Sequence, residues 1–365
     1  MAFSVLAVNP GSTSTKIAKF FGETELWNEI IRHSDEELAP FGSVVEQFDF
    51  RLKTIKAALD AHPDEHEPDA VVGRGGIIDP MPGGTFLVDK CLVERLKLGK
   101  PWEHASNLGG ILADALAYEC NEKHEKNVPA FIVDPVCVDE MKPEAKITGL
   151  PELPKISLSH ALNTKATVRR AAKELSKVWD ELCVVVVHLG GGISITAHRR
   201  GRIEDTNNVN DFGPFSPERA GGLPMGAVIS MCESGRYTES EIKRRIVGQG
   251  GLKAHLETSN MRKVAKRVKK SEKKATMLYR AMAWHIAKEI GAQAVSMGEK
   301  IDAVLFTGGM AYDSEFVRLI QERVQWIAPC LVYPGEGEMR ALAQGALRVL
   351  AGEEKPKRYH DYVKT

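Results

Sequence analysis

Two segments half a chain apart share one pattern: an apolar run, a tight turn, and a return to alternating residues. The first, VLAVNPGSTSTKIAKFFGE, begins at Val5, and the second, VVVVHLGGGISITAHRRGR, begins at Val184, so the offset is 184 − 5 = 179 residues. In this ungapped alignment Gly11 is matched with Gly190. Each copy predicts a β-hairpin whose turn leaves backbone N–H groups exposed. Together they predict a duplicated βββ-αβα unit, with the two hairpins facing each other across a cleft.

The first turn has the composition of a phosphate-binding loop but not the pattern of the P-loop. A P-loop requires a second Gly directly before its Lys and a Ser or Thr directly after it. Here Thr15 precedes Lys16 and Ile17 follows it. Phosphate at this turn would therefore have to be held in another way.

Strand-like and helical segments alternate along the chain, which predicts an α/β protein. Most of the expected strands are short continuous apolar runs, as is typical of strands buried on both faces. The expected strands are residues 4–8, 70–72, 130–133, 183–187 and 303–306, and the expected helices are 45–60, 108–120, 165–178, 274–297, 314–324 and 338–351. Gly352 follows the last helix and is expected to end it.

The length and charge of the chain narrow its class. A chain of 365 residues exceeds the size at which one core usually keeps growing, so two domains are expected. Lys plus Arg equals Asp plus Glu, 49 each, which argues against nucleic acid or a membrane surface as the main partner. The six scattered cysteines predict reduced thiols. The apolar run 182–187 is too short to span a bilayer, and the cytoplasm is the expected location.

A third turn, in the segment AVLFTGGMAYDS (303–314), lies between an apolar strand and a helix. Gly308 and Gly309 permit close approach of a nucleotide ribose or phosphate. A plain strand-to-helix turn is the alternative interpretation.

Taken with six further segments, these turns resemble the acetate/butyrate kinase family of the actin-like ATPase superfamily, and its butyrate kinases most closely. The resemblance extends over almost the whole chain, with the motifs in the order of the family. The motifs are NPGSTSTK (9–16), VVGRGG (71–76), EHASN (103–107), FIVDP (131–135), SHALN (159–163), HLGGGISI (188–195), SPERAGGLPMG (216–226), TGGM (307–310) and PGEGEMRALA (334–343).

The resemblance implies an α/β fold of two actin-like (ribonuclease H-like) domains around a cleft, residues 1–155 with 339–365 and residues 156–338. It implies reversible phosphoryl transfer from ATP to a short-chain carboxylate, giving acyl phosphate and ADP with Mg²⁺. A carboxylate is already an anion at neutral pH, so the difficulty is electrostatic and calls for arginine, histidine and Mg²⁺ rather than a strong base. Homodimers or higher homo-oligomers are typical of the family.

The family motifs also imply roles for individual residues. Those implied to act on the carboxylate and the transferred phosphoryl group are Arg74, His104, Asp134, His160 and Arg219. Those implied to bind the nucleotide or its phosphates are Asn9, Ser12, Ser14, Lys16, His188, Gly190, Gly191, Gly192, Arg262, Gly308, Gly309 and Met310. Those implied to serve Mg²⁺ are Asn9, Asp134 and Glu338, with Glu336 as the alternative to Glu338.

A further segment, which contains Asn260 and Arg262 and matches an adenine-contacting segment of the family, departs from it in one residue. Acetate kinases have Asp where this chain has Asn260. Whether this segment, including Arg262, contacts the adenine base therefore stays open. The stretch RKVAKRVKKSEKK (262–274) is strongly basic, and we expect a solvated helix face with Val264 and Val268 turned inward.

The size of three side chains bears on which acid is used. Acetate-specific members have Val, Leu and Phe where this chain has Gly76, Glu103 and Ser159. Room left by Val and Phe would accept extra methylenes, each worth about 0.8 kcal/mol when buried. Butyrate and isobutyrate are therefore expected to be preferred, with an acetate or propionate kinase as the alternative. A sugar or polyol kinase and a non-catalytic actin-like ATP switch are remoter alternatives, because neither calls for a set of Arg74, His160 and Arg219.

Overall fold

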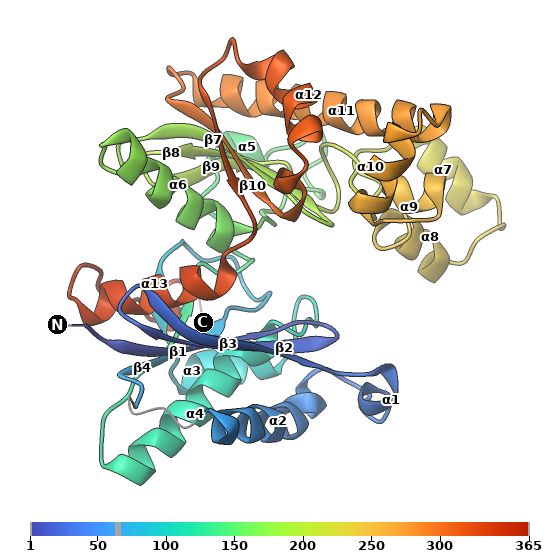
Figure 1. Ribbon diagram of the computed structural model, residues 1–365. Helices are drawn as coiled ribbons and strands as arrows, with labels where there is room; N and C mark the ends of the chain where they lie inside the picture. Colours follow the sequence, from blue (N-terminus) through green and yellow to red (C-terminus); the bar gives the residue numbers. More distant parts are fainter. Residues whose placement is uncertain (1, 63–66, 364–365) are drawn as a thin grey trace. The chain divides into compact units, whose positions relative to one another are not determined.

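The computed structural model describes residues 2–62 and 67–363, which divide into two compact units (Figure 1). The first unit comprises Met1–Asp139 and Gly337–Thr365, and the second comprises Glu140–Glu336. The chain thus leaves the first unit, builds the second, and returns. The domain bounds predicted from the sequence, at residues 155 and 338, stay a prediction.

The first unit contains a six-stranded mixed sheet in the order β3-β2-β1-β4-β6-β5. Strands β1 to β3 form an antiparallel meander, β4 and β6 continue the sheet parallel to β1, and β5 closes it antiparallel to β6. Their bounds are β1 Ser4–Pro10, β2 Ser14–Phe21, β3 Thr24–Arg32, β4 Ala70–Arg74, β5 Thr85–Leu87 and β6 Ala130–Val133.

The second unit repeats this plan in a five-stranded sheet of order β9-β8-β7-β10-β11. Again three strands form an antiparallel meander, and two more add in parallel to the first of them. Their bounds are β7 Cys183–Leu189, β8 Ile193–Arg199, β9 Arg202–Thr206, β10 Ala303–Gly308 and β11 Cys330–Pro334. The predicted duplication and both predicted hairpins, β1–β2 and β7–β8, are confirmed, and the fold is that of two actin-like α/β domains.

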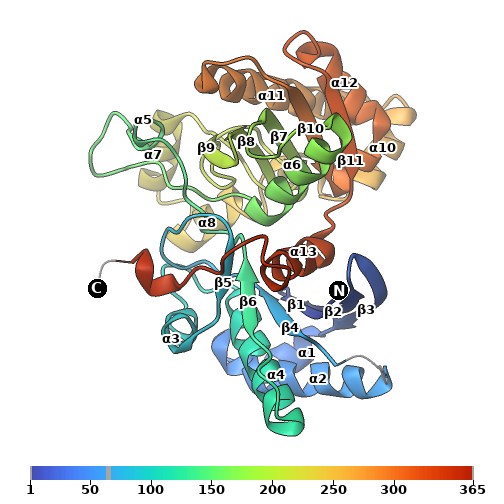
Figure 2. The same cartoon turned by 90° about the vertical axis from the view of Figure 1, so that its left-hand side faces the viewer.

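Helices cover both faces of the first sheet (Figure 2). Helices α2 and α4 lie on one face and α13 on the other. A Cβ added to Gly345 of α13 would lie 2.4 Å from Cγ2 of Val133, so glycine lets this helix approach β6 closely. The helices of this unit are α1 Asp35–Leu38, η1 Val45–Gln47, α2 Phe48–Ala61, α3 Lys90–Lys97, α4 Asn107–His124, α13 Glu338–Leu350 and η3 Tyr359–Asp361. Helix α13 follows 197 residues of the second unit, yet it completes the first.

The sheet of the second unit is also covered on both faces, and β7 divides its side chains between them. Val185 and Val187 pack in the core formed with α11 and α12, whereas Val184 and Val186 pack against α6. This period of two explains why the strand reads as a continuous apolar run. The helices of this unit are α5 Pro143–Lys146, α6 Ala161–Leu175, α7 Met225–Glu233, α8 Glu239–Ile246, α9 Gly251–Leu256, α10 Met261–Lys269, α11 Lys273–Met297, η2 Gly309–Tyr312 and α12 Ser314–Val324.

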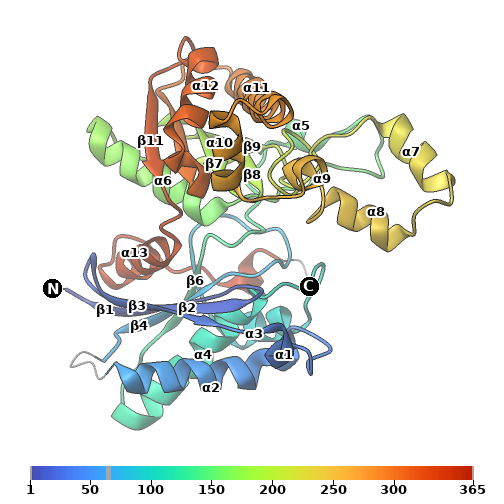
Figure 3. The same cartoon turned by 45° about the vertical axis from the view of Figure 1, so that its right-hand side comes forward.

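Helices α7 and α8 extend away from the sheet of their own unit (Figure 3). The sequence MGAVISMCE of α7 is apolar except for Ser230 and Glu233, yet no residue of this helix is buried. Sequence reasoning did not predict α7 to α9, because their patterns are short and lack a sustained apolar stripe.

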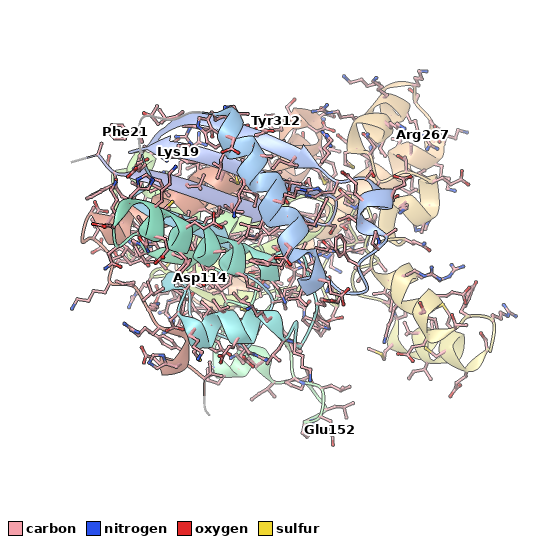
Figure 4. All side chains as sticks on the ribbon, turned by 90° about the horizontal axis from the view of Figure 1, so that it is seen from below. Lys19, Phe21, Asp114, Glu152, Arg267 and Tyr312 are labelled. Carbon is pink, nitrogen blue, oxygen red and sulfur yellow. The ribbon has the colours of Figure 1, made fainter. Side chains whose placement is uncertain are left out.

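All five predicted strands occur, four of them one or more residues longer than expected, and the helix predicted at 314–324 is found with these bounds. The helix predicted at 165–178 instead spans Ala161–Leu175, because Ser176 adopts a left-handed conformation (φ 53°) that ends it. The basic stretch is not one helix: α10 ends at Lys269 and α11 begins at Lys273. Arg267 and Glu272 form an ion pair across the break (Arg267 is labelled in Figure 4). Val264 is buried and Val268 packs against the core, as predicted.

No helix in the described part of the chain is long and apolar enough to cross a membrane. All six cysteines are free thiols. Gly352 has φ 75°, which agrees with its predicted place just after the last long helix.

Candidate functional site

Arg74 ends β4 with its side chain almost completely buried, 6% exposed. Its Nη2 lies 3.6 Å from Oε1 of Glu338, whereas its buried Nη1 has no hydrogen-bond partner among the described residues. A buried N–H without an acceptor is destabilising, and more so on a charged group. A ligand oxygen that reached Nη1 would satisfy it.

The first turn of α4 lies directly against the end of β4. A Cβ on Gly73 would lie 1.9 Å from the carbonyl oxygen of Gly109, and a Cβ on Gly109 would lie 2.2 Å from that of Arg74. Only glycine at both positions permits this approach. It brings the positive N-terminal end of an 18-residue helix beside Arg74, which favours an anion there.

Glu338 joins two other predicted residues. Asn9, near the end of β1, donates from Nδ2 to Oε2 of Glu338 at 2.8 Å, while Oε1 faces Arg74. Glu338 is the first residue of α13, directly after Gly337 in the left-handed conformation (φ 56°). Glu336, the alternative, is exposed and belongs to the second unit. In the first unit it is therefore Glu338 that meets Asn9 and Arg74.

Asp134 follows β6, whose last residue is in register with Arg74. It is buried and adopts a left-handed conformation (φ 38°), which is strained for a residue other than glycine and is common at functional sites. Gly84 fixes its carboxylate by donating from its backbone N to Oδ1 at 2.7 Å. A Cβ added to Gly75 would lie 2.5 Å from Cβ of Pro135, so the residues that follow β4 and β6 are close together.

The oxygen donors of this unit fit Mg²⁺. Asn9, Asp134 and Glu338 offer one amide and two carboxylate groups, which are ligands that Mg²⁺ prefers. Within the described ranges no cluster of three or more His, Cys, Asp and Glu could hold a metal ion by itself. Mg²⁺ usually keeps several waters and is held by one or two carboxylates with substrate phosphates, so this set suits a cation that arrives with a nucleotide.

The first hairpin turn contains Ser12, Ser14 and Lys16, with Lys16 directly opposite Asn9 in the ladder. Gly11 N donates to Ser14 O at 2.7 Å and closes the turn. Ser12 is exposed, and Ser14 and Lys16 are half-buried. The turn and the start of β2 therefore offer two hydroxyls and an ammonium that are exposed or half-buried.

Sequence reasoning missed Arg51, which lies completely buried behind this turn. Its guanidinium donates to the backbone of Ser12 and Ser14 and to the side chains of Thr15 and Gln47. A signal was present, because Arg51 falls on the same helical face as the buried residues Ile55 and Ala58.

His104 lies just before α4, with its ring exposed. Ser106 N donates to its Nδ1 at 3.1 Å, so Nδ1 acts as an acceptor and the ring proton belongs on Nε2. Glu103 is also exposed, and its Oε1 accepts from Val44 N at 2.6 Å.

The structure corrects the argument about free space at Gly76. A Cβ on Gly76 would lie 2.4 Å from Oδ1 and 2.8 Å from Cα of Asn107. Asn107, the first residue of α4, is itself fixed because its Oδ1 accepts from Ile77 N at 2.8 Å. The missing side chain at Gly76 thus leaves room for Asn107 and not for a longer substrate.

In the second unit, His160 and His188 stack face to face, with ring centroids 3.9 Å apart and an interplanar angle of 12°. His188, the residue before the last of β7, is buried, and its Nδ1 lies 2.7 Å from Oδ1 of Asn163. The Nδ2 of Asn163 donates to the carbonyl of Glu336, so its Oδ1 is free to accept the proton of His188 Nδ1. The ring of His188 is thereby fixed.

His160 is fixed by a serine of the neighbouring hairpin. Its backbone N donates to Ser194 Oγ at 3.1 Å, and its Nδ1 lies 2.7 Å from the same oxygen. Ser194 can therefore donate its own proton to Nδ1, which directs the ring proton of His160 to Nε2. Ser159, just before it, is buried, and its hydroxyl has no hydrogen-bond partner within the described part of the chain.

The second hairpin turn consists of Gly190, Gly191 and Gly192, and a guanidinium lies against it. A Cβ on Gly192 would lie 2.2 Å from Nη1 of Arg219. Ser216 fastens the arginine segment to the turn, because its Oγ donates to Gly191 O and accepts from Arg219 N. Burial lowers the pKa of Arg219, and the nearby Glu218 opposes the shift.

Arg219 keeps unused hydrogen-bonding capacity. Its Nη1 makes a long bond of 3.4 Å to Val209 O, and its buried Nε has no partner among the described residues. A guanidinium N–H that is buried and unpaired beside a glycine turn suits an anionic ligand.

The third turn adjoins the second. Gly308 has φ 91°, and a Cβ there would lie 2.4 Å from Leu189 O, so glycine is required for this approach. Gly309 has open space in the direction of a side chain, whereas Met310 packs in the core. The structure thus joins His160, His188, Arg219 and two glycine turns within one unit.

Arg262 is not joined to this group by any hydrogen bond or ion pair among the described residues. It is exposed on α10, and Asn260 acts as the N-cap of that helix by accepting from Lys263 N at 3.2 Å. A capping function accounts for Asn260 without a nucleotide.

The fold is that of the two-domain acetate kinases. A crystal structure of Porphyromonas gingivalis acetate kinase superposes with a TM-score of 0.77 and 17% identity, over 95% of this chain and 100% of that one. A propionate kinase from Francisella tularensis gives 0.74 and 18% over 94% and 98%, and the acetate kinase of Entamoeba histolytica gives 0.72 and 16% over 94% and 99%.

The sequence adds to this likeness in one part of the chain. Residues 159–326, which contain His160, the second turn, Arg219 and the third turn, match the profile of the Acetokinase family. The chain is thus similar in fold to these kinases, and residues 159–326 are similar in sequence to the Acetokinase family.

Proposed function

We propose that this protein is a carboxylate kinase that transfers a phosphoryl group reversibly between Mg-ATP and a short-chain carboxylate, with butyrate preferred to acetate. The observation that carries the proposal is Arg74. It is buried beside the N-terminus of α4 with one nitrogen unpaired, and a carboxylate is the planar anion that a guanidinium binds best.

The residues of the first unit are assigned to the acid and the metal. Arg74 would orient the carboxylate, and Asn9, Asp134 and Glu338 would hold Mg²⁺ with the phosphates of the nucleotide. Mg²⁺ supplies charge neutralisation on the phosphoryl oxygens. Ser12, Ser14 and Lys16 would meet phosphate oxygens.

The residues of the second unit are assigned to the nucleotide and the group in transfer. His160 would donate from Nε2 to a phosphoryl oxygen, and Arg219 would stabilise the same charge. His188 supports the ring of His160 by stacking on it. The turns at Gly190–Gly192 and Gly308–Gly309 would face the phosphates and the ribose. No general base is required, because the nucleophile is already ionised.

The preference for butyrate depends on Ser159, since Asn107 occupies the space at Gly76. Replacing the Phe of acetate-specific members with Ser removes a large side chain beside His160. Each additional buried methylene is worth about 0.8 kcal/mol, so two could favour butyrate by roughly tenfold. Because Asn107 fills the space beside Gly76, less room remains there for a longer acid. This favours the second candidate, a propionate or acetate kinase.

The test is to measure kcat/KM for acetate, propionate, butyrate, isobutyrate and valerate with Mg-ATP, trapping acyl phosphate with hydroxylamine. We expect butyrate and isobutyrate to exceed acetate by about tenfold. A preference for acetate or propionate would refute the finer proposal and retain a carboxylate kinase. Phosphorylation of glycerol or glucose without activity on any acid, or slow ATP hydrolysis indifferent to acids, would refute the proposal as a whole.

A further inference from the structure

We propose that Arg51 is the positioning residue of the first turn. It fixes the turn from behind and leaves beneath it a positive charge whose counter-ion is the polyphosphate of the bound ligand. This inference rests on the proposed function, because it takes the turn formed by residues 11–14 to be where phosphate binds.

Arg51 uses all its donors on the structure around the turn. A guanidinium has five N–H groups. Nε and Nη2 donate to Gln47 Oε1 at 3.0 and 2.9 Å, Nη2 also to Ser12 O at 3.3 Å, and Nη1 to Ser14 O at 3.1 Å and Thr15 Oγ1 at 3.0 Å. No donor is left for a ligand. Arg51 therefore acts through the turn and not by contact.

The charge of Arg51 is not matched by a carboxylate. Every acceptor named above is neutral, and no ion pair of Arg51 exists among the residues that the structure describes. Burial lowers the pKa of Arg51 to about 10, so the group is still charged at neutral pH. Hydrogen bonds to neutral oxygens replace the lost hydration but do not cancel the net charge.

The pKa of His33 is affected by the positive charge of Arg51. Thr15 Oγ1 accepts from Arg51 and lies 2.9 Å from Nε2 of His33, so the threonine proton is available to His33 Nε2. That bond requires Nε2 without a proton. Burial and then the charge of Arg51 lower the pKa of His33, opposed by Glu37. The histidine is thus neutral at pH 7 and adds no second cation.

Arg95 of the same unit is the structural contrast. It pairs with the carboxylate of Asp79 through Nε and Nη2, and Tyr359 donates to the same carboxylate. The charge of Arg95 is therefore balanced within the protein. Arg51 differs because no carboxylate among the described residues pairs with it, so in this proposal the ligand supplies the balancing charge.

The test compares Arg51→Gln, Arg51→Lys and the control Arg95→Gln by calorimetric titration with two probes, Mg-tripolyphosphate and Mg-ATP. We expect Arg51→Gln to weaken both by about tenfold or more, and Arg51→Lys, which keeps the charge with fewer donors, to stay within about threefold of the parent. Arg95→Gln should lower Tm and leave both Kd values unchanged.

If Arg51→Gln fails to fold, the pair Thr15→Val and Gln47→Leu decides, because these variants remove contacts of Arg51 and keep its charge. Binding of both probes that is weaker by about threefold or more in either variant supports the proposal, because the charge alone then does not suffice. A lower Tm with both Kd values unchanged from the parent overturns it, because the contacts of Arg51 would then serve stability alone.

The outcomes also separate this inference from the proposed function. Equal Kd values for the parent and Arg51→Gln overturn the inference, whatever activity the parent has on carboxylates. A parent that binds tripolyphosphate through Arg51 but phosphorylates no acid retains the inference and refutes the proposed function. A parent that binds neither probe overturns the inference.

Discussion

The two hairpin turns occupy the same place in two sheets that share the order of five strands, yet the side chains around them are arranged in opposite ways. The first turn carries side chains, Ser12, Ser14 and Lys16, and its arginine lies behind it with every donor engaged. The second turn carries only glycines, and its arginine lies against Gly192 with Nε unused. Arg51 thus supports the backbone of the first turn, whereas Arg219 at the second turn has a donor available for a ligand.

This difference teaches that a duplicated fold need not duplicate its chemistry. The backbone supplies N–H groups at both turns, so the side chains are free to diverge. The first unit combines hydroxyls, an amide and carboxylates, which suits a metal ion. The second combines two stacked imidazoles and a guanidinium, which suits a transferring phosphoryl group.

The largest expected effect distinguishes the two guanidinium groups that we assign to ligand binding, those of Arg74 and Arg219. Arg74→Ala should lower kcat/KM for the acid by about 10³-fold, mostly through KM, because the proposed carboxylate site loses its guanidinium. Arg219→Ala should act mainly on kcat. Hydroxamate assays with varied acid and varied ATP measure both. Identical effects of the two variants on KM for the acid would contradict the division of tasks between the units.

The next prediction compares the two turns directly. Gly192→Ala should lower kcat by about 10²-fold, because its Cβ would lie 2.2 Å from Arg219 Nη1 and displace the guanidinium. Gly11→Ala is the matched control: its Cβ would meet nothing nearer than Ser14 O at 3.5 Å, an ordinary contact. Its activity should stay within about threefold of the parent. If Gly11→Ala were the more damaging variant, the first turn and not the second would depend on close approach.

The comparison also predicts which residue sets the preference for acids of different chain length. Ser159→Phe should shift the ratio of kcat/KM for butyrate over acetate by about tenfold toward acetate. Gly76→Val should instead lower the free energy of unfolding by about 1–3 kcal/mol, because Asn107 occupies the space. Urea unfolding measures the second effect. A stable Gly76→Val variant with changed acid preference would restore Gly76 as part of a substrate pocket.

The smallest effect concerns His198 of the second unit, whose ring is completely buried with no hydrogen-bond partner in the described ranges. Burial lowers its pKa to about 3, with smaller effects from Lys165 and Glu140. Below pH 6.5 the unfolded chain binds a proton that the folded chain does not. Stability should therefore fall as pH drops, by at most roughly 1.4 kcal/mol per pH unit, and the contribution should be constant above pH 7.

His198→Leu should flatten this dependence in urea unfolding between pH 5 and 7, whereas replacing the exposed His255 in the same way should not. An unchanged slope in His198→Leu would assign the acid sensitivity to other groups, His33 of the first unit among them.

Much of the fold was predictable from two periodic signals. Continuous apolar runs located strands buried on both faces, and the offset of 179 residues located both hairpins. Strand β3 escaped, because its alternation of exposed and half-buried residues, from Thr24 to Arg32, contains Trp, Glu and Asn and reads as a polar loop. Helix α7 escaped because its nine residues are nearly all apolar and show no separate apolar and polar faces from which a helix could be recognised.

The site was predictable in its members more than in its surroundings. Arg74, Asn9 and Glu338 meet in the first unit as the motifs implied, and His160, His188 and Arg219 gather in the second. Two errors have one cause. Arg51 was missed and Gly76 misread because side-chain size and charge were judged at single positions. Asn107 and the backbone of residues 12–14 reach those positions from other parts of the chain.

The placement of Glu338 carries a consequence for biosynthesis. The residue stands at the start of α13, which joins the first unit after the second has been completed. During synthesis, a chain released before Gly337 could fold Glu140–Glu336 and most of the earlier sheet. It would still lack both the helix that covers that sheet and the carboxylate beside Arg74. A site that depends on the Glu338 carboxylate would then be withheld from any chain released before Gly337.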